Sequence, residues 1–173
     1  QRELLSRLIV NAFRDITGVH NKTSLEKFIQ ELSNRPSTFG VGVMMFDLNN
    51  LKTVNDTRGH SAGDQLILSF ARLLRRVIPE KHFVGRYGGD EFMAVIYHTD
   101  RQEVEGILDS LRREADAANR DGNQLPLSYA YGWAISADYE GCIMQTLLDK
   151  ADYCMYENKR AYYATHDRRA PRP

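Results

Sequence analysis

The residues best suited to chemistry are three carboxylates, Asp47, Asp90 and Glu91. Asp90 and Glu91 directly follow Gly88 and Gly89, and Asp47 follows a short apolar run. Adjacent carboxylates offer the oxygen ligands that a hard cation such as Mg²⁺ takes, and paired glycines let a bulky ligand approach the main chain. The pattern therefore favours metal-assisted phosphate chemistry. For the glycine pair and its acids alone, the alternative is an ordinary hairpin with solvated carboxylates.

Predicted strands must position these acids. The run 41–46 is short and almost wholly apolar, which is typical of a central strand covered on both faces, and it places Asp47 at the strand's end. The apolar runs 82–84 and 92–97 flank the glycine pair, so the other two acids are expected at the tight turn of a β-hairpin. A rigid sheet would then hold each carboxylate where it reaches solvent.

Helices are predicted between the strands, because apolar residues recur there at helical spacing. They are expected at residues 2–14, 23–32, 65–78, 104–118 and 144–163, with a further strand at 127–135. The chain thus interleaves helices with about five strands, which indicates an α/β (α+β) domain.

Composition describes an ordinary globular domain: 173 residues, 42% hydrophobic and 27% charged, which is enough for one domain with a sizeable core. Lys+Arg and Asp+Glu number 23 each, so bulk charge gives no basis for nucleic-acid or membrane-surface binding. No apolar run approaches the ~20 residues that span a bilayer. Cys142 and Cys154 lack metal spacing, and Cys154 is expected in the core, which favours a reducing, cytoplasmic location.

Four blocks, in order and at matching spacing, resemble the GGDEF family of bacterial diguanylate cyclases. Residues 86–92, Arg-Tyr-Gly-Gly-Asp-Glu-Phe, match every position of the family signature. Residues 47–64 match the block Asp-x-Asp-x-Phe-Lys-x-Ile-Asn-Asp-x-x-Gly-His-x-x-Gly-Asp without a gap, and residues 15–22 and 151–159 resemble the opening and closing blocks. The resemblance implies the nucleotidyl-cyclase palm-like fold, a central, mainly antiparallel sheet of about five strands flanked by helices.

The resemblance also implies a reaction and a site. Two GTP molecules would be joined into cyclic di-GMP with release of two pyrophosphates, using two Mg²⁺ ions per active site or Mn²⁺ in their place. The implied metal ligands are Asp47, the Leu48 carbonyl, Asp90 and Glu91, of which Asp47, Asp90 and Glu91 are the catalytic residues. The implied substrate contacts are Lys52 and Lys159 for the triphosphate, Asn55 and Asp64 for guanine, and Gly88 and Gly89, which leave room for the nucleotide.

The chain departs from the family pattern at a few positions. Asn49 replaces an aspartate and Leu51 a phenylalanine, and Tyr162 and Tyr163 stand where Gly and Arg are usual, which removes one expected triphosphate contact. One alternative is therefore a catalytically degenerate domain that binds GTP or another nucleotide and signals without turnover. Another is an enzyme that makes an adenine-containing cyclic dinucleotide, which Asp64 opposes because a carboxylate suits guanine's N–H donors.

A regulatory site of the family is also expected to be absent. Many members carry an Arg-x-x-Asp product-binding site upstream of the signature, and Pro79 and His82 stand at its two positions here. Proline has no side-chain donor and neutral histidine lacks a carboxylate's charge. Feedback inhibition through this site is therefore not expected.

The expected organisation is a linker or signalling helix at 1–14, the catalytic domain at 15–164 and a flexible tail at 165–173. Because the chain begins at Gln1 without a methionine, it is expected to be a module of a longer protein with an upstream sensor domain. One domain can hold one GTP, so a homodimer is expected to be part of the mechanism. No contact of this domain with nucleic acid or membrane is expected.

Overall fold

The computed structural model describes residues 14–122 and 125–166. One antiparallel sheet has the strand order β2-β3-β1-β4. In chain order the elements are α2 (Lys22–Ser33), β1 (Val41–Leu48), α3 (Leu51–Arg58), α4 (His60–Val77), β2 (Phe83–Arg86), β3 (Glu91–Tyr97), α5 (Arg101–Arg120), β4 (Tyr129–Ile135), the 3₁₀ helix η1 (Ser136–Asp138) and α6 (Met144–Thr165). The predicted α/β (α+β) fold is confirmed, with four strands in place of about five.

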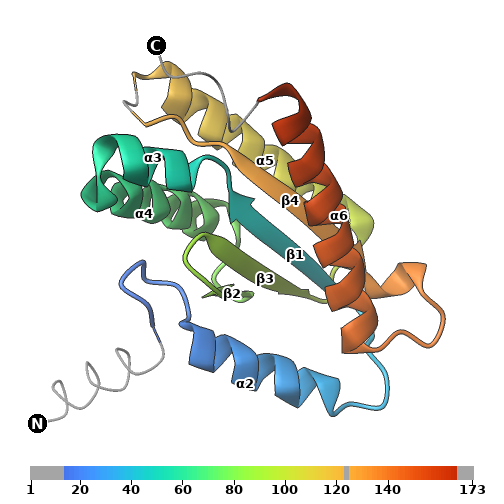
Figure 1. Ribbon diagram of the computed structural model, residues 1–173. Coiled ribbons are helices and arrows are strands. Elements are labelled where there is room, and N and C mark those ends of the chain that lie inside the picture. Colours follow the sequence, from blue (N-terminus) through green and yellow to red (C-terminus); the bar gives the residue numbers. More distant parts are fainter. Residues whose placement is uncertain (1–13, 123–124, 167–173) are drawn as a thin grey trace, which may run out of the picture.

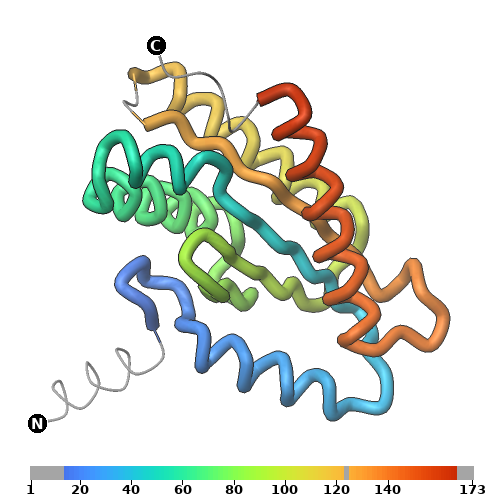
Figure 2. Tube along the Cα trace, in the orientation of Figure 1, coloured from blue at the N-terminus to red at the C-terminus, as the bar shows by residue number. Residues whose placement is uncertain are grey.

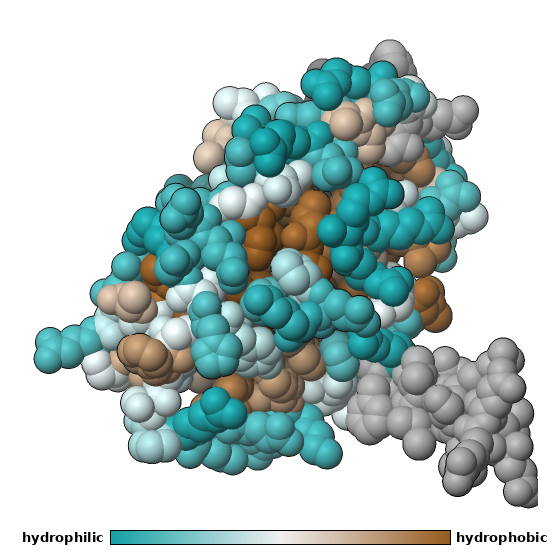
Figure 3. All heavy atoms as spheres, turned by 180° about the vertical axis from the view of Figure 1, so that it is seen from behind, coloured by the Kyte–Doolittle hydropathy of each residue, from teal (hydrophilic) through white to brown (hydrophobic). Residues whose placement is uncertain are grey.

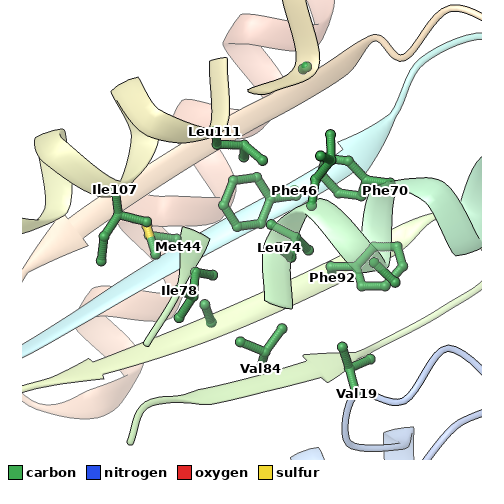
Figure 4. Packing of buried hydrophobic residues seen from close by; sticks show 14 of the residues in the cluster. Val19, Met44, Phe46, Phe70, Leu74, Ile78, Val84, Phe92, Ile107 and Leu111 are labelled. Atoms are coloured by element: carbon green, nitrogen blue, oxygen red, sulfur yellow. The ribbon is translucent and has the colours of Figure 1, made fainter. Parts of the chain in front are cut away.

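Helices cover both faces of the sheet (Figures 1 and 2), and each face has its own hydrophobic cluster. Strand β1 is buried on both sides, as predicted: Met44 and Phe46 join the cluster under α4 and α5, whereas Val43 joins the cluster under α2 and α6. Around Phe70 of α4 (Figure 4), the rings of Phe46 and Phe92 pack edge to face with centroids 5.9 and 5.4 Å away. Such packing makes the sheet a rigid support for the residues at its ends.

Groups from outside the sheet hydrogen-bond to backbone groups at both of its edges. Along β2, His20 donates its N–H to the Val84 carbonyl over 2.9 Å and accepts from the Arg86 N–H over 2.8 Å, so one residue of an irregular segment pairs with this edge. Along β4, the Tyr131 N–H donates to Asn158 Oδ1 of α6 over 3.0 Å. Both edges therefore have some of their backbone groups paired.

The contact of α6 with the sheet is close. A Cβ added at Gly132 of β4 would overlap the Ala151 carbonyl and the Met155 nitrogen of α6, so glycine is required for this approach. Cys154 lies on the outer side of α6 and is exposed, which corrects the expected core position, whereas Cys142 is buried. The apolar spacing of α6 was ambiguous there because the helix is amphipathic only over part of its length.

Three helices differ from the expected ones. Helix α2 is capped by Asn21, whose Oδ1 accepts from the Ser24 N–H over 2.9 Å. Helix α3 was not predicted, because none of its residues is buried and its sequence carries no apolar stripe. Helix α4 begins at His60 rather than Gln65, directly after Gly59, whose φ of 86° ends α3. Helix α5 is capped by Asp100, whose Oδ1 accepts from the Glu103 N–H over 2.8 Å.

The predicted N-terminal helix, apart from Arg14, and most of the predicted tail lie outside the described residues. Viewed from behind (Figure 3), the face carrying α4 and α5 is mainly hydrophilic, with a small apolar area in a hollow near its middle. None of the helices within residues 14–122 and 125–166 is both long and apolar enough to cross a bilayer.

Candidate functional site

The predicted catalytic acids lie together at one end of the sheet, where β1 ends and β3 begins. Asp47 of β1 is paired with Glu91 of β3, so it lies within the strand rather than after it. The Leu48 N–H donates to the Asp90 backbone carbonyl over 3.0 Å, which ties the hairpin loop to β1. Lys159 of α6 reaches the same corner and donates from Nζ to Asp47 Oδ2 over 2.6 Å. The fold thus unites residues from three separate blocks of the sequence.

The Asp47 carboxylate is buried, and within the described residues only one of its two oxygens accepts a hydrogen bond. Its side chain is 9% exposed, and its Oδ1 is buried without a hydrogen-bond partner within the described part of the chain. Burial, joined by the nearby Asp90 carboxylate, raises the pKa of Asp47 to about 6 against the opposing hydrogen bond from Lys159. A buried oxygen in this state is costly unless a donor or a cation completes it. The corner is therefore suited to one more positive group.

Glu91 lies near two other carboxylates. Burial raises the pKa of Glu91, and the negative charges of Asp90 and Asp152 raise it further, whereas Lys159 and Lys22 lower it. Over residues 14–122 and 125–166, no group of three or more His, Cys, Asp or Glu side chains is arranged to hold a metal ion. A cation here would thus need ligands from outside the protein, as Mg²⁺ has when one or two carboxylates and substrate phosphates share it.

The loop between β2 and β3 is held by Arg86. Its Nε and Nη2 donate to the carbonyls of Gly88 and Gly89 over 3.0 and 2.8 Å, and its Nη1 lies 3.2 Å from Asp15 Oδ1. The hairpin is confirmed, but pairing ends at Arg86 and Phe92, so the turn is longer than the predicted tight one. A Cβ at Gly89 would meet no atom within 4 Å, which leaves open space at the tip. Arg86 and Asp15 were not singled out as site residues, although both lie within matched blocks.

The residues expected to contact guanine lie on α3 and α4, which pack against each other beyond β1. Asn55 of α3 has a buried Oδ1 without a hydrogen-bond partner in the described chain. Gly63 of α4 makes room for this side chain, because a Cβ there would overlap Asn55 Oδ1. Asp64 follows Gly63 directly and is exposed, as is Lys52 on α3. The helix pair therefore fixes Asn55 tightly and leaves Asp64 and Lys52 open to a ligand.

The loop between β1 and α3 is anchored by residues at which the chain departs from the expected pattern. Asn49 donates from Nδ2 to Ser128 Oγ over 3.0 Å, and its N–H donates to the Ser128 carbonyl over 2.9 Å. Asn50 donates from its N–H to Tyr163 Oη over 2.9 Å and from Nδ2 to Tyr162 Oη over 2.6 Å. Sequence reasoning missed Ser128 and Asn50, since neither contact follows from local pattern.

A pocket of about 580 Å³ opens beside Glu91, between α2, α6 and the sheet. Its floor is apolar and includes Met45 and Met93, and none of the lysines and arginines that the structure describes lines it. Its other acidic residues are Glu26, Asp149 and Asp152. An anionic ligand is therefore disfavoured on this side and favoured on the side of Lys159 and Lys52.

Comparison with known proteins identifies the family of the chain. The chain matches the family model described as "Diguanylate cyclase, GGDEF domain" over residues 12–163. It is 28% identical to diguanylate cyclase DgcN of Escherichia coli over 89% of its own length, and 30% identical to cyclic di-GMP phosphodiesterase NbdA of Pseudomonas aeruginosa over 85%. It spans 38% of the first protein and 19% of the second, so it corresponds to one part of each.

Solved structures agree as well. The coiled coil and GGDEF domain of DgcB from Caulobacter crescentus, in complex with c-di-GMP, matches with a TM-score of 0.76 and 25% sequence identity, covering 92% of this chain and 87% of that one. The expected family resemblance and fold are thereby confirmed.

Proposed function

The chain belongs to the GGDEF family of diguanylate cyclase domains, and on this premise we propose that it condenses two GTP molecules into cyclic di-GMP and releases two pyrophosphates. The observation that carries the proposal is the corner at the end of β1. There a buried Asp47 carboxylate, one oxygen of which has no hydrogen-bond partner among the described residues, lies beside the Asp90 carboxylate and the Lys159 ammonium. Carboxylates beside a lysine suit a phosphate that arrives with its metal ion.

Mg²⁺ fits the donors at this corner. The proposed ligands are the Asp47 carboxylate, the Leu48 carbonyl and Asp90, with Glu91 serving a second ion, and Mn²⁺ accepts the same oxygen donors. The buried Asp47 Oδ1, which accepts no hydrogen bond from residues 14–122 or 125–166, supports the assignment. When bound, the metal supplies charge neutralisation and a lower pKa of the attacking hydroxyl.

In the proposed reaction each ribose 3′-OH attacks the α-phosphate of the other GTP. A P–O bond forms at the 3′ oxygen, the bond to the β-phosphate breaks, and the hydroxyl proton leaves. Where Glu91 does not hold the second ion, it is the proposed proton acceptor, because burial and the neighbouring negative charges raise its pKa. Lys159 and Lys52 offset the triphosphate charge, whereas Asn55 and Asp64 pair with the edge of guanine.

The reaction needs two nucleotides, and each domain is proposed to bind one. Two copies must therefore face each other with their sites opposed, which makes the homodimer part of the catalytic unit. We also propose that an upstream sensor domain controls this arrangement and that the domain works in the cytoplasm, where GTP is available.

The test is to incubate the purified protein with GTP and Mg²⁺ and to identify the products by chromatography and mass spectrometry. Cyclic di-GMP with two pyrophosphates per molecule, lost in Asp47→Asn, supports the proposal. GTP binding without any product would favour the nucleotide-binding alternative, and a product containing adenine from mixed nucleotides would favour the other one. Absence of both GTP binding and product would overturn the proposal.

A further inference from the structure

Two tyrosines in the last turns of α6 hold the residue that precedes α3. Tyr163 Oη accepts a hydrogen bond from the Asn50 N–H over 2.9 Å, and Tyr162 Oη accepts one from Asn50 Nδ2 over 2.6 Å. The two rings contact each other edge to face with centroids 5.0 Å apart, so each orients the other. The backbone N–H of Asn50 is therefore occupied by a side chain from the far end of the chain.

Asn50 occupies the N-cap position of α3. Its φ of 64° lies in the left-handed region, and its side chain makes no capping hydrogen bond to the helix. The first N–H groups of a helix lack partners within the helix, and with the helix dipole they favour a negatively charged oxygen. Lys52, in the first turn of α3, adds an exposed cation. These groups favour binding of a phosphate oxygen.

The same face of α6 serves the proposed metal corner. Lys159 and Tyr163 lie one turn apart on α6, and they contact Asp47 and Asn50 at the end of β1. The buried Asp47 Oδ1, unpartnered within the described residues, is a second and independent sign that a ligand completes this region. With the triphosphate placed at this corner, as proposed, the Asn50 N–H that Tyr163 occupies is a group for which a phosphate oxygen competes.

We propose that the Tyr163 hydroxyl occupies the position of a phosphate oxygen at the Asn50 N–H, and that it is displaced when a nucleoside triphosphate binds. The inference rests on the proposed function, because it assumes that the triphosphate lies at this corner. Tyr163 then lowers the affinity of the domain for its substrate, since the hydrogen bond from the Asn50 N–H to the Tyr163 hydroxyl must be broken first. Tyr162 bonds only the Asn50 side chain and does not compete for the amide.

The test is Tyr163→Phe, which keeps the ring and removes the competing oxygen. Affinity for a GTP analogue with a methylene group between its α- and β-phosphates, measured by calorimetry with Mg²⁺, is expected to rise about 2- to 10-fold, the factor that one net hydrogen bond is worth. Guanosine, which has no phosphate, is expected to bind both proteins equally. Tyr162→Phe is the matched control, because it also removes one hydroxyl from Asn50, and it is expected to leave the affinity within about 2-fold of the native value.

Unchanged or weaker binding of the analogue by Tyr163→Phe overturns the inference, and so does an equal gain in Tyr162→Phe, which would trace the gain to a looser loop. Turnover of GTP by the native protein is measured in parallel. Native turnover with no gain in Tyr163→Phe refutes only this inference, whereas a native protein that neither binds nor converts GTP refutes the proposed function itself.

Discussion

Lys159 and Asp47 form a contact of 2.6 Å between Nζ and Oδ2 across a sequence separation of 112 residues. The contact joins the last helix to the central strand at the corner where the metal is proposed. It opposes the rise in the pKa of Asp47 only in part, because burial and the Asp90 charge prevail. The pair therefore leaves a carboxylate that binds a proton more readily than usual.

This raised pKa predicts a pH-dependent stability difference. Asp47 has a pKa of about 6 in the folded protein against 3.8 for an unperturbed aspartate, so the metal-free protein loses stability as pH rises between these values. Asp47→Asn does not titrate, and its free energy of unfolding relative to the native protein is expected to rise over that interval by on the order of 2 kcal/mol. Urea denaturation at pH 4, 5, 6 and 7.5, set about these pKa values, measures the difference. A difference independent of pH would contradict the assignment.

Asp90→Ala is expected to reduce cyclisation at least about 100-fold, because a lost metal ligand removes several kcal/mol of charge stabilisation. The fold is expected to stay intact, since the backbone carbonyl through which Asp90 ties its loop to β1 remains in the alanine variant. Initial rates of cyclic di-GMP formation and the thermal unfolding midpoint are the two measurements. Glu140→Ala, at an exposed acid away from the site, is the control and should retain full activity. If Asp90→Ala converted GTP at the native rate, Asp90 would not be a metal ligand.

Gly63→Ala is expected to cost about 1 to 3 kcal/mol of stability and to weaken GTP binding, because overpacking strains a tight contact. The new Cβ would overlap Asn55 Oδ1. The matched control is Gly106→Ala on α5, where a Cβ meets no atom within 4 Å. That change is expected to stabilise the protein by about 0.5 to 1 kcal/mol, since alanine favours a helix. Equal effects of the two substitutions in urea denaturation would show that Asn55 is not held by Gly63.

Asp64→Ala is expected to weaken GTP binding about 10- to 100-fold, the value of a hydrogen bond to a charged group. Any ATP binding should change much less, because adenine lacks the N–H donors that face this carboxylate. Titrations with both nucleotides and Mg²⁺ give the two ratios, and Asp116→Ala on α5 controls for a general loss of negative charge. Equal losses for GTP and ATP would show that Asp64 does not read the base.

Product inhibition through the usual upstream site is not expected. His82 is buried, and its Nδ1 accepts from the Tyr97 N–H over 3.0 Å, so this ring nitrogen already has a partner within the fold. Burial lowers the pKa of His82 and keeps the ring neutral. Arg76 is paired with Glu114 at 2.9 Å. Progress curves should therefore stay linear as cyclic di-GMP accumulates well above micromolar levels, apart from competition at the active site.

A calorimetric titration with cyclic di-GMP tests the same expectation by measuring binding of the product directly. Tight binding that Arg75→Ala or Arg76→Ala abolishes, and that excess GTP analogue leaves in place, would establish a product site next to Pro79.

Local pattern was enough to predict the strands and most helices. The run 41–46 reads as a central strand because both faces are apolar, and Asp47 beyond it reads as a site residue. Helix α3 escaped prediction because it buries none of its residues. The contacts of Lys159 with Asp47 and of Tyr163 with Asn50 depend on how α6 docks onto the sheet, which no short stretch of sequence encodes. The expected count of about five strands was one too high, because the sequence supplied apolar runs for only the four strands that the sheet contains.

The hydrogen bond from the Tyr131 N–H to Asn158 has a consequence for copies of this domain at high concentration. An edge strand with unpaired backbone groups is a template on which another chain can add a strand and begin to aggregate. Strand β4 carries aromatic side chains of high β-propensity at Tyr129, Tyr131 and Trp133, which increases that hazard. Because Asn158 already accepts from the middle of β4, an incoming strand finds that donor taken. A single amide on α6 thus hinders edge-to-edge pairing between copies that are proposed to meet face to face for the reaction.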